Sequence, residues 1–340
     1  MVIRPAPGKP KLAAAEMLDL VPGILRIAAS GLRAAATGPW RGPEGAPTYL
    51  LHICYAVLRR STRRLSVAQL QWILPGTDQS YLKYCKQVKA APRSVDLPHG
   101  ARGHWIGDPD ADNVLLWYHG GGWCVPAMDT YYHFFGQLVA SSAAAGKSLA
   151  VFALSYTLVP HARYPTQLRQ AVGGDSAGAS LALGVLSHLA HPHPAIDELR
   201  LAKPLAGAVC MAPWVGDVEG AVDDAVPVQG DLLTPDARRC VDAYRSPGEM
   251  DYYTDHMDAP CSWFEGFPVR KMLICVGGHE IFRPLGEMFA EKLKSGFPAT
   301  ELFVGEGEAH VAPVFNMRFG SKVETHQGRR IKQWLVETLP

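Results

Sequence analysis

The spacing of hydrophobic positions changes near residue 90 of this chain. Before that point apolar residues recur every three to four positions, as in amphipathic helices, and Thr48–Arg60 is a clear example. Gly and Pro cluster over residues 38–47, which predicts a loop between helices. Leu12–Ala36 is expected to form two amphipathic helices that meet near Pro22-Gly23. We therefore expect residues 1–90 to form an N-terminal helical cap region.

From about residue 93 onward, short strand patterns alternate with turns and helices. Arg93–Leu97 and Arg102–Ile106 are predicted to form an antiparallel pair joined by Pro98-His99-Gly100. Continuous apolar runs predict buried strands at Asn113–Tyr118, Leu149–Tyr156, Leu205–Met211, Met272–Val276 and Glu301–Val304. Helical patterns lie between them at about 130–145, 177–190, 284–295 and 328–337. This alternation indicates an α/β fold over residues 91–340, with a mainly parallel sheet covered by helices on both faces.

Residues 215–268 lack such a pattern and are rich in Asp, Pro and aromatic side chains. We expect irregular structure that lies over the carboxyl edge of the sheet. This segment is predicted to form a wall of the pocket rather than a separate domain.

Composition is that of an ordinary globular protein, with 48% hydrophobic and 19% charged residues. A formal net charge of +1 gives no indication of nucleic-acid binding. The basic residues Arg59, Arg60, Arg63 and Arg64 are interpreted as a solvated helix face. The seven cysteines are scattered without metal-binding spacing, which favours reduced thiols, a cytoplasmic setting and no metal site.

The N-terminal stretch Leu12–Ala36 bears on membrane contact. It lacks the pattern of a secretory signal, and its charged residues make it too polar to span a bilayer. Apolar residues of this stretch can nevertheless face lipid as easily as protein, namely Ile24, Leu25, Ile27 and Leu32, so peripheral membrane contact is an open alternative.

Two short motifs carry the candidate chemistry. Gly174–Gly178 reads G-x-S-x-G, the turn that presents a nucleophilic serine between a strand and a helix. His119–Trp123 reads His-Gly-Gly-Gly-Trp, a loop type that exposes backbone N–H groups to an oxyanion. Ser176 is therefore the candidate nucleophile. The candidate oxyanion donors are the N–H groups of Gly120, Gly121, Gly122 and Ala177.

An acid and a base should follow the nucleophile in the order Ser, Asp or Glu, His. Glu280 follows the predicted strand Met272–Val276 and is the candidate acid. His310 lies in the loop after the last predicted strand and is the candidate base, with His279 as a competitor. Asp175 is expected to hold the serine turn in place.

Three aromatic residues near the two motifs are candidate pocket residues, although simple core packing explains each equally well. They are Trp123, Tyr131 and Tyr132. His119 is expected to orient its loop rather than to transfer a proton.

These features resemble the hormone-sensitive-lipase group of α/β-hydrolases, and within it the steryl-acetyl-hydrolase-like esterases of fungi. The resemblance covers most of the chain and rests on His119–Trp123, Ser155-Tyr156, Pro160, Tyr164-Pro165, Gly174–Gly178, Glu280 and His310. It implies an α/β-hydrolase catalytic domain at 91–340 that needs no cofactor. It also implies hydrolysis of carboxylic esters, often acetates of bulky hydrophobic alcohols, in lipid or secondary-metabolite pathways. The expected partner is thus a hydrophobic small-molecule ester.

The chain departs from this group just before Gly174. Relatives place a helix and a buried strand between the Tyr-Pro pair and the serine turn, whereas here only residues 166–173 separate Tyr164-Pro165 from Gly174. Neighbouring parallel strands need a crossover of about a dozen residues or more, usually with a helix. We therefore expect either a distorted serine turn or a chain that is not the full native product, such as a splice variant or a mis-joined gene model. Two alternatives to an active esterase follow, namely an impaired or non-catalytic α/β-hydrolase and a biosynthetic cyclase on the same fold.

Overall fold

The computed structural model describes residues 9–168, 174–216, 230–234, 236, 239–244 and 251–340. The α-helices among these residues are α1 (Ala14–Thr37), α2 (Tyr49–Arg64), α3 (Val67–Ile73), α4 (Thr77–Val88), α5 (Asp129–Ala144), α6 (Ala177–Ala190), α7 (Arg239–Tyr244), α8 (Arg283–Gly296), α9 (Ala312–Arg318) and α10 (His326–Thr338). The strands are β1 (Ser94–Asp96), β2 (Arg102–Ile106), β3 (Asn113–Tyr118), β4 (Leu149–Ser155), β5 (Gly174–Asp175), β6 (Ala208–Met211), β7 (Met272–Gly277) and β8 (Thr300–Gly305).

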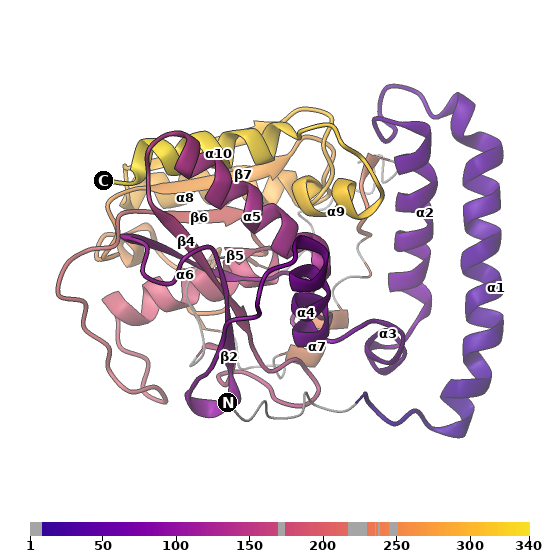
Figure 1. Ribbon diagram of the computed structural model, residues 1–340, viewed down its shortest axis with the longest axis horizontal. Coiled ribbons are helices and arrows are strands. Elements are labelled where there is room, and N and C mark those ends of the chain that lie inside the picture. Colours follow the sequence, from indigo (N-terminus) through magenta and orange to yellow (C-terminus); the bar gives the residue numbers. More distant parts are fainter. Residues whose placement is uncertain (1–8, 169–173, 217–229, 235, 237–238, 245–250) are drawn as a thin grey trace.

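The strands form one eight-stranded sheet in the order β1-β2-β4-β3-β5-β6-β7-β8 (Figure 1). β2 pairs antiparallel with β1 and with β4, whereas all pairs from β4 to β8 are parallel. The predicted α/β class and the positions of its strands are therefore confirmed. Sequence did not predict α9, which is too short to show a periodic pattern.

Helices cover both faces of the sheet because the central strands are apolar on both sides. On one face, side chains of α4, α5 and α10 form a core cluster with strand residues such as Trp117 and Val151. On the other face, α6 and α8 pack against residues such as Ile274 and Val276. This sandwich holds the carboxyl ends of the parallel strands at one edge, where loops can meet.

The first helix is continuous, so the predicted break near Pro22 is wrong. Pro22 lies inside α1, where a proline costs about 3 kcal/mol because a backbone hydrogen bond is lost. The helix persists because one side packs along α2: Leu20, Gly23, Gly31 and Ala34 are all buried. Tertiary packing here outweighs the local preference of proline.

Residues 14–88 are helical apart from short connections, as expected for the N-terminal region. α1 and α2 form a hairpin at one side of the sheet (Figure 1). By contrast α4 packs against α5, and its Tyr81 and Tyr84 belong to the main core. The division into a cap at 1–90 and a catalytic domain at 91–340 stays a prediction.

The short connection before Ser176 contains turns and, at Leu168, a 3-10 residue, but no α-helix where it is described, at residues 156–168. β5 is nevertheless present between β3 and β6: Gly174 pairs with Tyr118 on one side and with Cys210 on the other. On β3, an interior strand, Val114 is 46% exposed.

The segment 215–268 is mostly irregular where it is described, apart from α7, a 3-10 helix at Cys261–Phe264 and single 3-10 residues at Gly230 and Asp236. Its residues 217–229, 235, 237–238 and 245–250 lie outside the described residues.

Candidate active site

Ser176 lies at the turn between β5 and α6 and adopts φ 52° and ψ −122°. A positive φ at a residue with a side chain is strained, and such strain is characteristic of nucleophile turns. The Ser176 N–H donates to the Met211 carbonyl at 2.8 Å, which fixes the turn to the end of β6. The following Gly178 packs so closely that a Cβ atom would lie 2.3 Å from the Tyr118 carbonyl oxygen. The serine turn is thus formed despite the short connection that precedes it.

Asp175 joins the serine turn to the glycine loop. Its Oδ2 accepts hydrogen bonds from the Gly120 N–H at 3.0 Å and the Tyr131 hydroxyl at 2.7 Å. Its Oδ1 accepts from Trp117 Nε1 at 2.8 Å. Burial raises the pKa of Asp175 to about 6, although these donors act in the opposite direction. The prediction that Asp175 holds the turn is confirmed.

The bond to Asp175 also engages the N–H of Gly120, so this group is not free for an oxyanion. The N–H groups of Gly121 and Gly122 form no hydrogen bond with any residue that the structure describes. Both glycines have positive φ, at 107° and 59°. A Cβ atom on Gly122 would also lie 2.7 Å from Cβ of Cys240, on α7. Glycine is therefore required here both by backbone conformation and by space.

Glu280 and His310 lie together at the ends of β7 and β8. Glu280 Oε1 is 3.7 Å from His310 Nδ1, which is an ion-pair distance and too long for a hydrogen bond. The other carboxylate oxygen accepts from the Gly277 N–H at 2.8 Å. Both side chains are almost fully buried. This pair has the arrangement expected of an acid that orients a catalytic base.

Burial and charge act in opposite directions on this pair. Burial disfavours the imidazolium of His310, but Glu280, assisted by Asp231 and Asp175, raises the pKa of His310 above its ordinary value. Burial raises the pKa of Glu280 above its ordinary value, although His310 lowers it in part. The raised pKa of His310 means that its imidazole readily accepts a proton, as a general base must.

Asp231 is a residue of this site that the sequence analysis missed. Its Oδ1 accepts from the N–H of His310 at 2.9 Å, and its Oδ2 accepts from the N–H of Ile281 at 2.9 Å. Asp231 thereby connects the loop that carries His310 with Ile281, the residue after Glu280. Arg59 on α2 donates to the Asp231 carbonyl, so the helical hairpin is linked to both loops.

The contacts of Arg59 also correct the interpretation of the basic cluster as a solvated face. Arg63 forms an ion pair with Asp236 at 2.7 Å, and Arg64 pairs with Asp19 on α1. Three of the four arginines thus connect α2 with other segments.

Aromatic rings connect the nucleophile with the base. The backbone N–H of Trp214 donates to the backbone carbonyl of Ser176 at 3.2 Å. The Trp214 ring lies 4.8 Å from that of Phe282, which lies 5.4 Å from the His310 ring. Beside them, Trp123 stacks on Tyr244 at 4.2 Å with nearly parallel planes. The surroundings of Ser176 are therefore strongly apolar.

Two of the predicted pocket residues lie behind the site instead of on its aromatic side. Tyr131 and Tyr132 belong to the core cluster of α5, and their hydroxyls donate to Asp175 and to the Thr77 carbonyl. Their contacts give them a supporting role. Sequence could not separate these two environments because aromatic side chains suit both.

His119 and His279, the two other histidines that the sequence analysis considered, have contacts that differ from those of a catalytic base. His119 Nδ1 bonds to the Gly120 carbonyl at 2.8 Å, its ring stacks on Tyr156, and burial lowers the pKa of His119 to about 4. His279 faces Glu44 at 4.0 Å.

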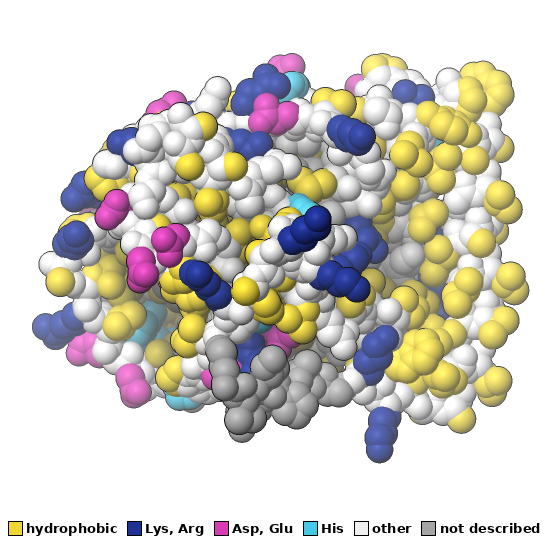
Figure 2. Space-filling view, in the orientation of Figure 1, with side chains coloured by type: hydrophobic (Ala, Val, Ile, Leu, Met, Phe, Trp, Pro, Cys, Tyr) yellow, Lys and Arg dark blue, Asp and Glu magenta, His cyan; other side chains and the backbone are white. Residues whose placement is uncertain are grey.

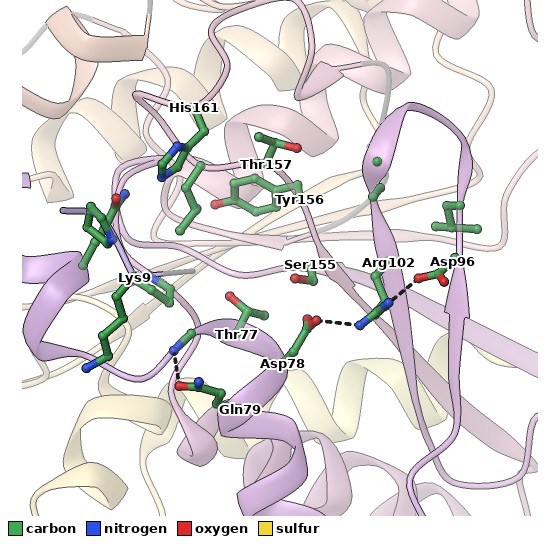
Figure 3. A pocket seen from close by; sticks show the side chains of 18 residues that line it. Lys9, Thr77, Asp78, Gln79, Asp96, Arg102, Ser155, Tyr156, Thr157 and His161 are labelled. Carbon is green, nitrogen blue, oxygen red and sulfur yellow. Dashed lines mark hydrogen bonds and ion pairs between the residues drawn. The ribbon is translucent and has the colours of Figure 1, made fainter. Parts of the chain in front are cut away.

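A cavity of about 470 Å³ opens beside this site, between α4, the β1–β2 turn and the end of β4 (Figure 3). Tyr156 lines it and donates to the His119 carbonyl at 2.8 Å, so the cavity lies behind the glycine loop. Its charged groups largely neutralise one another: Arg102 contacts Asp78 at 2.8 Å and Asp96 at 2.6 Å. None of Ser176, Glu280 and His310 lines it.

Comparisons with known proteins agree with this fold. A family model described as the alpha/beta hydrolase fold matches residues 167–314, which include Ser176, Glu280 and His310. A search of curated protein sequences finds no significant match.

Several solved structures have the same fold. A thermostable esterase from Pseudomonas putida superposes with a TM-score of 0.62 at 18% identity, covering 87% of this chain and 99% of that one. An esterase of the bacterial hormone-sensitive lipase family gives 0.61 at 18% identity, covering 87% and 100%. Carboxyl esterase 2 from the fungus Tuber melanosporum gives 0.59 at 20% identity, covering 74% and 87%.

The sheet order, the serine turn and the family model together show that the chain has the α/β-hydrolase fold. Within that fold, the solved structures that it resembles are esterases, one of them of the bacterial hormone-sensitive lipase family.

Proposed function

We propose that this protein is a serine hydrolase that cleaves carboxylic esters, with Ser176 as nucleophile, His310 as general base and Glu280 as the acid that orients it. The observation that carries this proposal is the buried Glu280–His310 pair at 3.7 Å, linked through Phe282 and Trp214 to the serine turn. In the proposed reaction, His310 removes the hydroxyl proton as Ser176 attacks the ester carbonyl. The proton then passes to the leaving alcohol, and water hydrolyses the acyl-enzyme.

The developing oxyanion would be stabilised by the N–H groups of Gly121, Gly122 and Ala177. The first two are unengaged among the described residues, and the third is at the N-terminus of α6, where the helix dipole favours negative charge. Gly120 would contribute indirectly, because its N–H is bonded to Asp175 and fixes the loop.

The proposed substrate is a short-chain, preferably acetyl, ester of a hydrophobic small molecule, in lipid or secondary-metabolite biosynthesis. The rings of Trp123, Tyr244 and Trp214 support an apolar substrate. Cys240 fills space directly beside Gly122, which supports a small acyl group. Trp123 is the pocket residue that we retain from the sequence analysis.

One observation favours a second candidate, a catalytically impaired α/β-hydrolase. In the described residues, the connection before β5 contains no α-helix, and β5 meets β3 at the single pair Tyr118–Gly174. A serine turn with so little support could bind a ligand without efficient turnover.

Hydrolysis of p-nitrophenyl acetate tests the proposal. We expect turnover by the wild-type chain and a loss of about 10⁴-fold or more in kcat for Ser176→Ala. The matched control is Ser180→Ala, which removes a buried hydroxyl one turn along α6 and should keep most of the activity. A fluorophosphonate probe followed by peptide mass spectrometry should label Ser176.

Equal rates in the wild type and Ser176→Ala would refute the assigned nucleophile. A folded wild-type chain with neither turnover nor labelling would support the impaired alternative. Labelling at Ser176 together with conversion of a substrate to an isomer, without hydrolysis, would support the alternative of a biosynthetic cyclase on the same fold.

A further inference from the structure

The side of α1 that faces away from α2 is unusually apolar. We call it the outer face and define it by Met17, Leu18, Val21, Ile24, Leu25 and Leu32, which are between 44% and 75% exposed. Figure 2 shows hydrophobic side chains along this whole edge of the molecule, over α1. Nine of the nineteen large hydrophobic residues that are exposed in the described chain lie between Met17 and Leu50. A concentrated apolar surface of this kind marks an interaction site.

Charge is distributed unevenly around the same helix. The two acids of α1 point toward α2 and α3: Asp19 pairs with Arg64, and Glu16 accepts from Ser66 at 3.4 Å. The two arginines, Arg26 and Arg33, are exposed and form no ion pair with the part of the chain that the structure describes. Asp19 is engaged by Arg64 although its side chain is 43% exposed, so the exposed surface of α1 combines apolar residues with an excess of positive charge.

An exposed indole lies where α1 ends. Trp40 is 81% exposed, and Tyr49 and Leu50 are exposed close to it in sequence. Tryptophan and tyrosine prefer the boundary between lipid and water, because their rings are apolar and carry one polar group.

We propose that the outer face of α1 docks on the surface of a phospholipid bilayer that carries anionic headgroups. In this arrangement α1 lies in the plane of the interface, with its leucines among the acyl chains and Arg26 and Arg33 at the headgroups. No helix among the described residues is long and apolar enough to cross a bilayer, so the contact is peripheral. The net charge of +1 hides this property because it averages over the whole chain.

The charge pattern favours a bilayer over a second copy of the chain. In a symmetric dimer the same surface meets itself. Arg26 and Arg33 would then approach their equivalents on the partner, whereas the two acids of α1 are already engaged, Asp19 by Arg64 and Glu16 by Ser66. Anionic headgroups supply the missing negative charge.

This position also suits an enzyme for lipophilic esters. α2 separates α1 from the loops of Glu280 and His310, and Arg59 on α2 bonds to Asp231, which holds both loops. The docked face is thus one helix away from the site. The proposal does not depend on ester hydrolysis, since the contact with lipid is made by α1 alone.

Co-sedimentation of the full chain with lipid vesicles tests the proposal without any substrate. We expect partition onto vesicles of phosphatidylcholine mixed with phosphatidylserine, and weaker partition onto phosphatidylcholine alone. The triple variant Leu18→Gln, Leu25→Gln, Leu32→Gln should partition at least about tenfold less onto both, because each change removes apolar area from the interface. Glutamine keeps a good helix propensity, and the replaced side chains are exposed, so circular dichroism should be unchanged.

The matched control is Leu82→Gln, Leu199→Gln, Val323→Gln, which changes three exposed apolar residues elsewhere and should bind like the wild type. A second variant, Arg26→Gln with Arg33→Gln, should lose roughly tenfold of the binding to phosphatidylserine vesicles while binding to phosphatidylcholine remains.

Three results would overturn the proposal. The wild-type chain could remain in the supernatant with both kinds of vesicle, or the triple leucine variant could bind as well as the wild type. The third is a dimer in analytical ultracentrifugation that dissociates in the leucine variant while no vesicle binding occurs. That result would assign the outer face to a second copy of the chain.

Discussion

Three buried carboxylates surround the serine turn and the base, and each has different partners. Asp175 binds the glycine loop and Tyr131, whereas Glu280 faces the ring of His310. Asp231 accepts from the backbone of both loops that carry the acid and the base. Because Asp231 does not touch the reacting atoms, we assign it as a positioning residue.

The pH dependence of catalysis tests the roles of His310 and Asp231. A protonated His310 cannot accept the proton of Ser176, so kcat/KM should fall as the pH drops through the pKa of His310. That pKa is raised above its ordinary 6.5, in part by Asp231, so the midpoint should lie above 6.5. Asp231→Asn should move the midpoint to lower pH and reduce kcat about ten- to a hundredfold, because the charge is lost and the amide keeps an acceptor oxygen for only one of the two N–H groups.

The control for this experiment is Asp236→Asn, which removes an exposed acid paired with Arg63 and should leave the profile unchanged. A merely structural role of Asp231 would reduce kcat without a shift of the midpoint. A wild-type profile in Asp231→Asn would contradict the assignment.

At the scale of elements, the hairpin of α1 and α2 depends on small residues at its contact. A Cβ atom on Gly31 would lie 3.0 Å from Cγ2 of Val57, and one on Gly23 would lie 3.3 Å from Cδ2 of Leu65. The two helices therefore approach closely, and this contact offsets the cost of Pro22 inside α1.

Gly31→Leu should weaken the hairpin by about 1–3 kcal/mol through overpacking, even though leucine has a higher helix propensity than glycine. The expected result is faster cleavage within α1 in limited proteolysis. Ala28→Leu is the matched control, because it enlarges an exposed residue of the same helix. Equal cleavage of the two variants would show that close packing does not hold α1 in place.

At the scale of the whole molecule, the sheet is covered unevenly. Val151 on β4 is fully buried, whereas Val114 on the neighbouring β3 is 46% exposed. The described part of the connection before β5 contributes no α-helix, whereas a helix normally covers a parallel sheet at such a crossover.

This difference in burial predicts that a valine-to-threonine substitution lowers the free energy of unfolding by different amounts at the two positions. Val114→Thr should change the free energy of unfolding by less than about 0.5 kcal/mol, as at most surface positions. Val151→Thr should cost about 1–3 kcal/mol, because it buries a hydroxyl in an apolar core. Denaturant titration of both variants measures this, and a large loss in Val114→Thr would show that β3 is covered in solution.

The sequence predicted the strands and most helices well, because continuous apolar runs have few alternatives in an α/β protein. It also placed Glu280 and His310 next to strands that the structure brings together. It failed where the outcome depends on distant contacts. Pro22 indicated a break that packing on α2 prevents, and Tyr131 gave no sign that its hydroxyl reaches Asp175.

Asp231 was missed for a different reason. It lies in a segment without periodicity, where an acid normally means a solvated turn. The only signal was the apolar pair Leu232-Leu233 directly after it, which is compatible with burial.

The link from Arg59 to Asp231 has a thermodynamic consequence. If lipid contact at α1 alters the loops of Glu280 and His310 through this link, the coupling free energy must act equally in the other direction. A reversible ligand that occupies the space above Ser176 would then change the affinity for vesicles by the same factor by which vesicles change the affinity for that ligand. The hairpin would thus report on the occupancy of the catalytic centre as well as influence it.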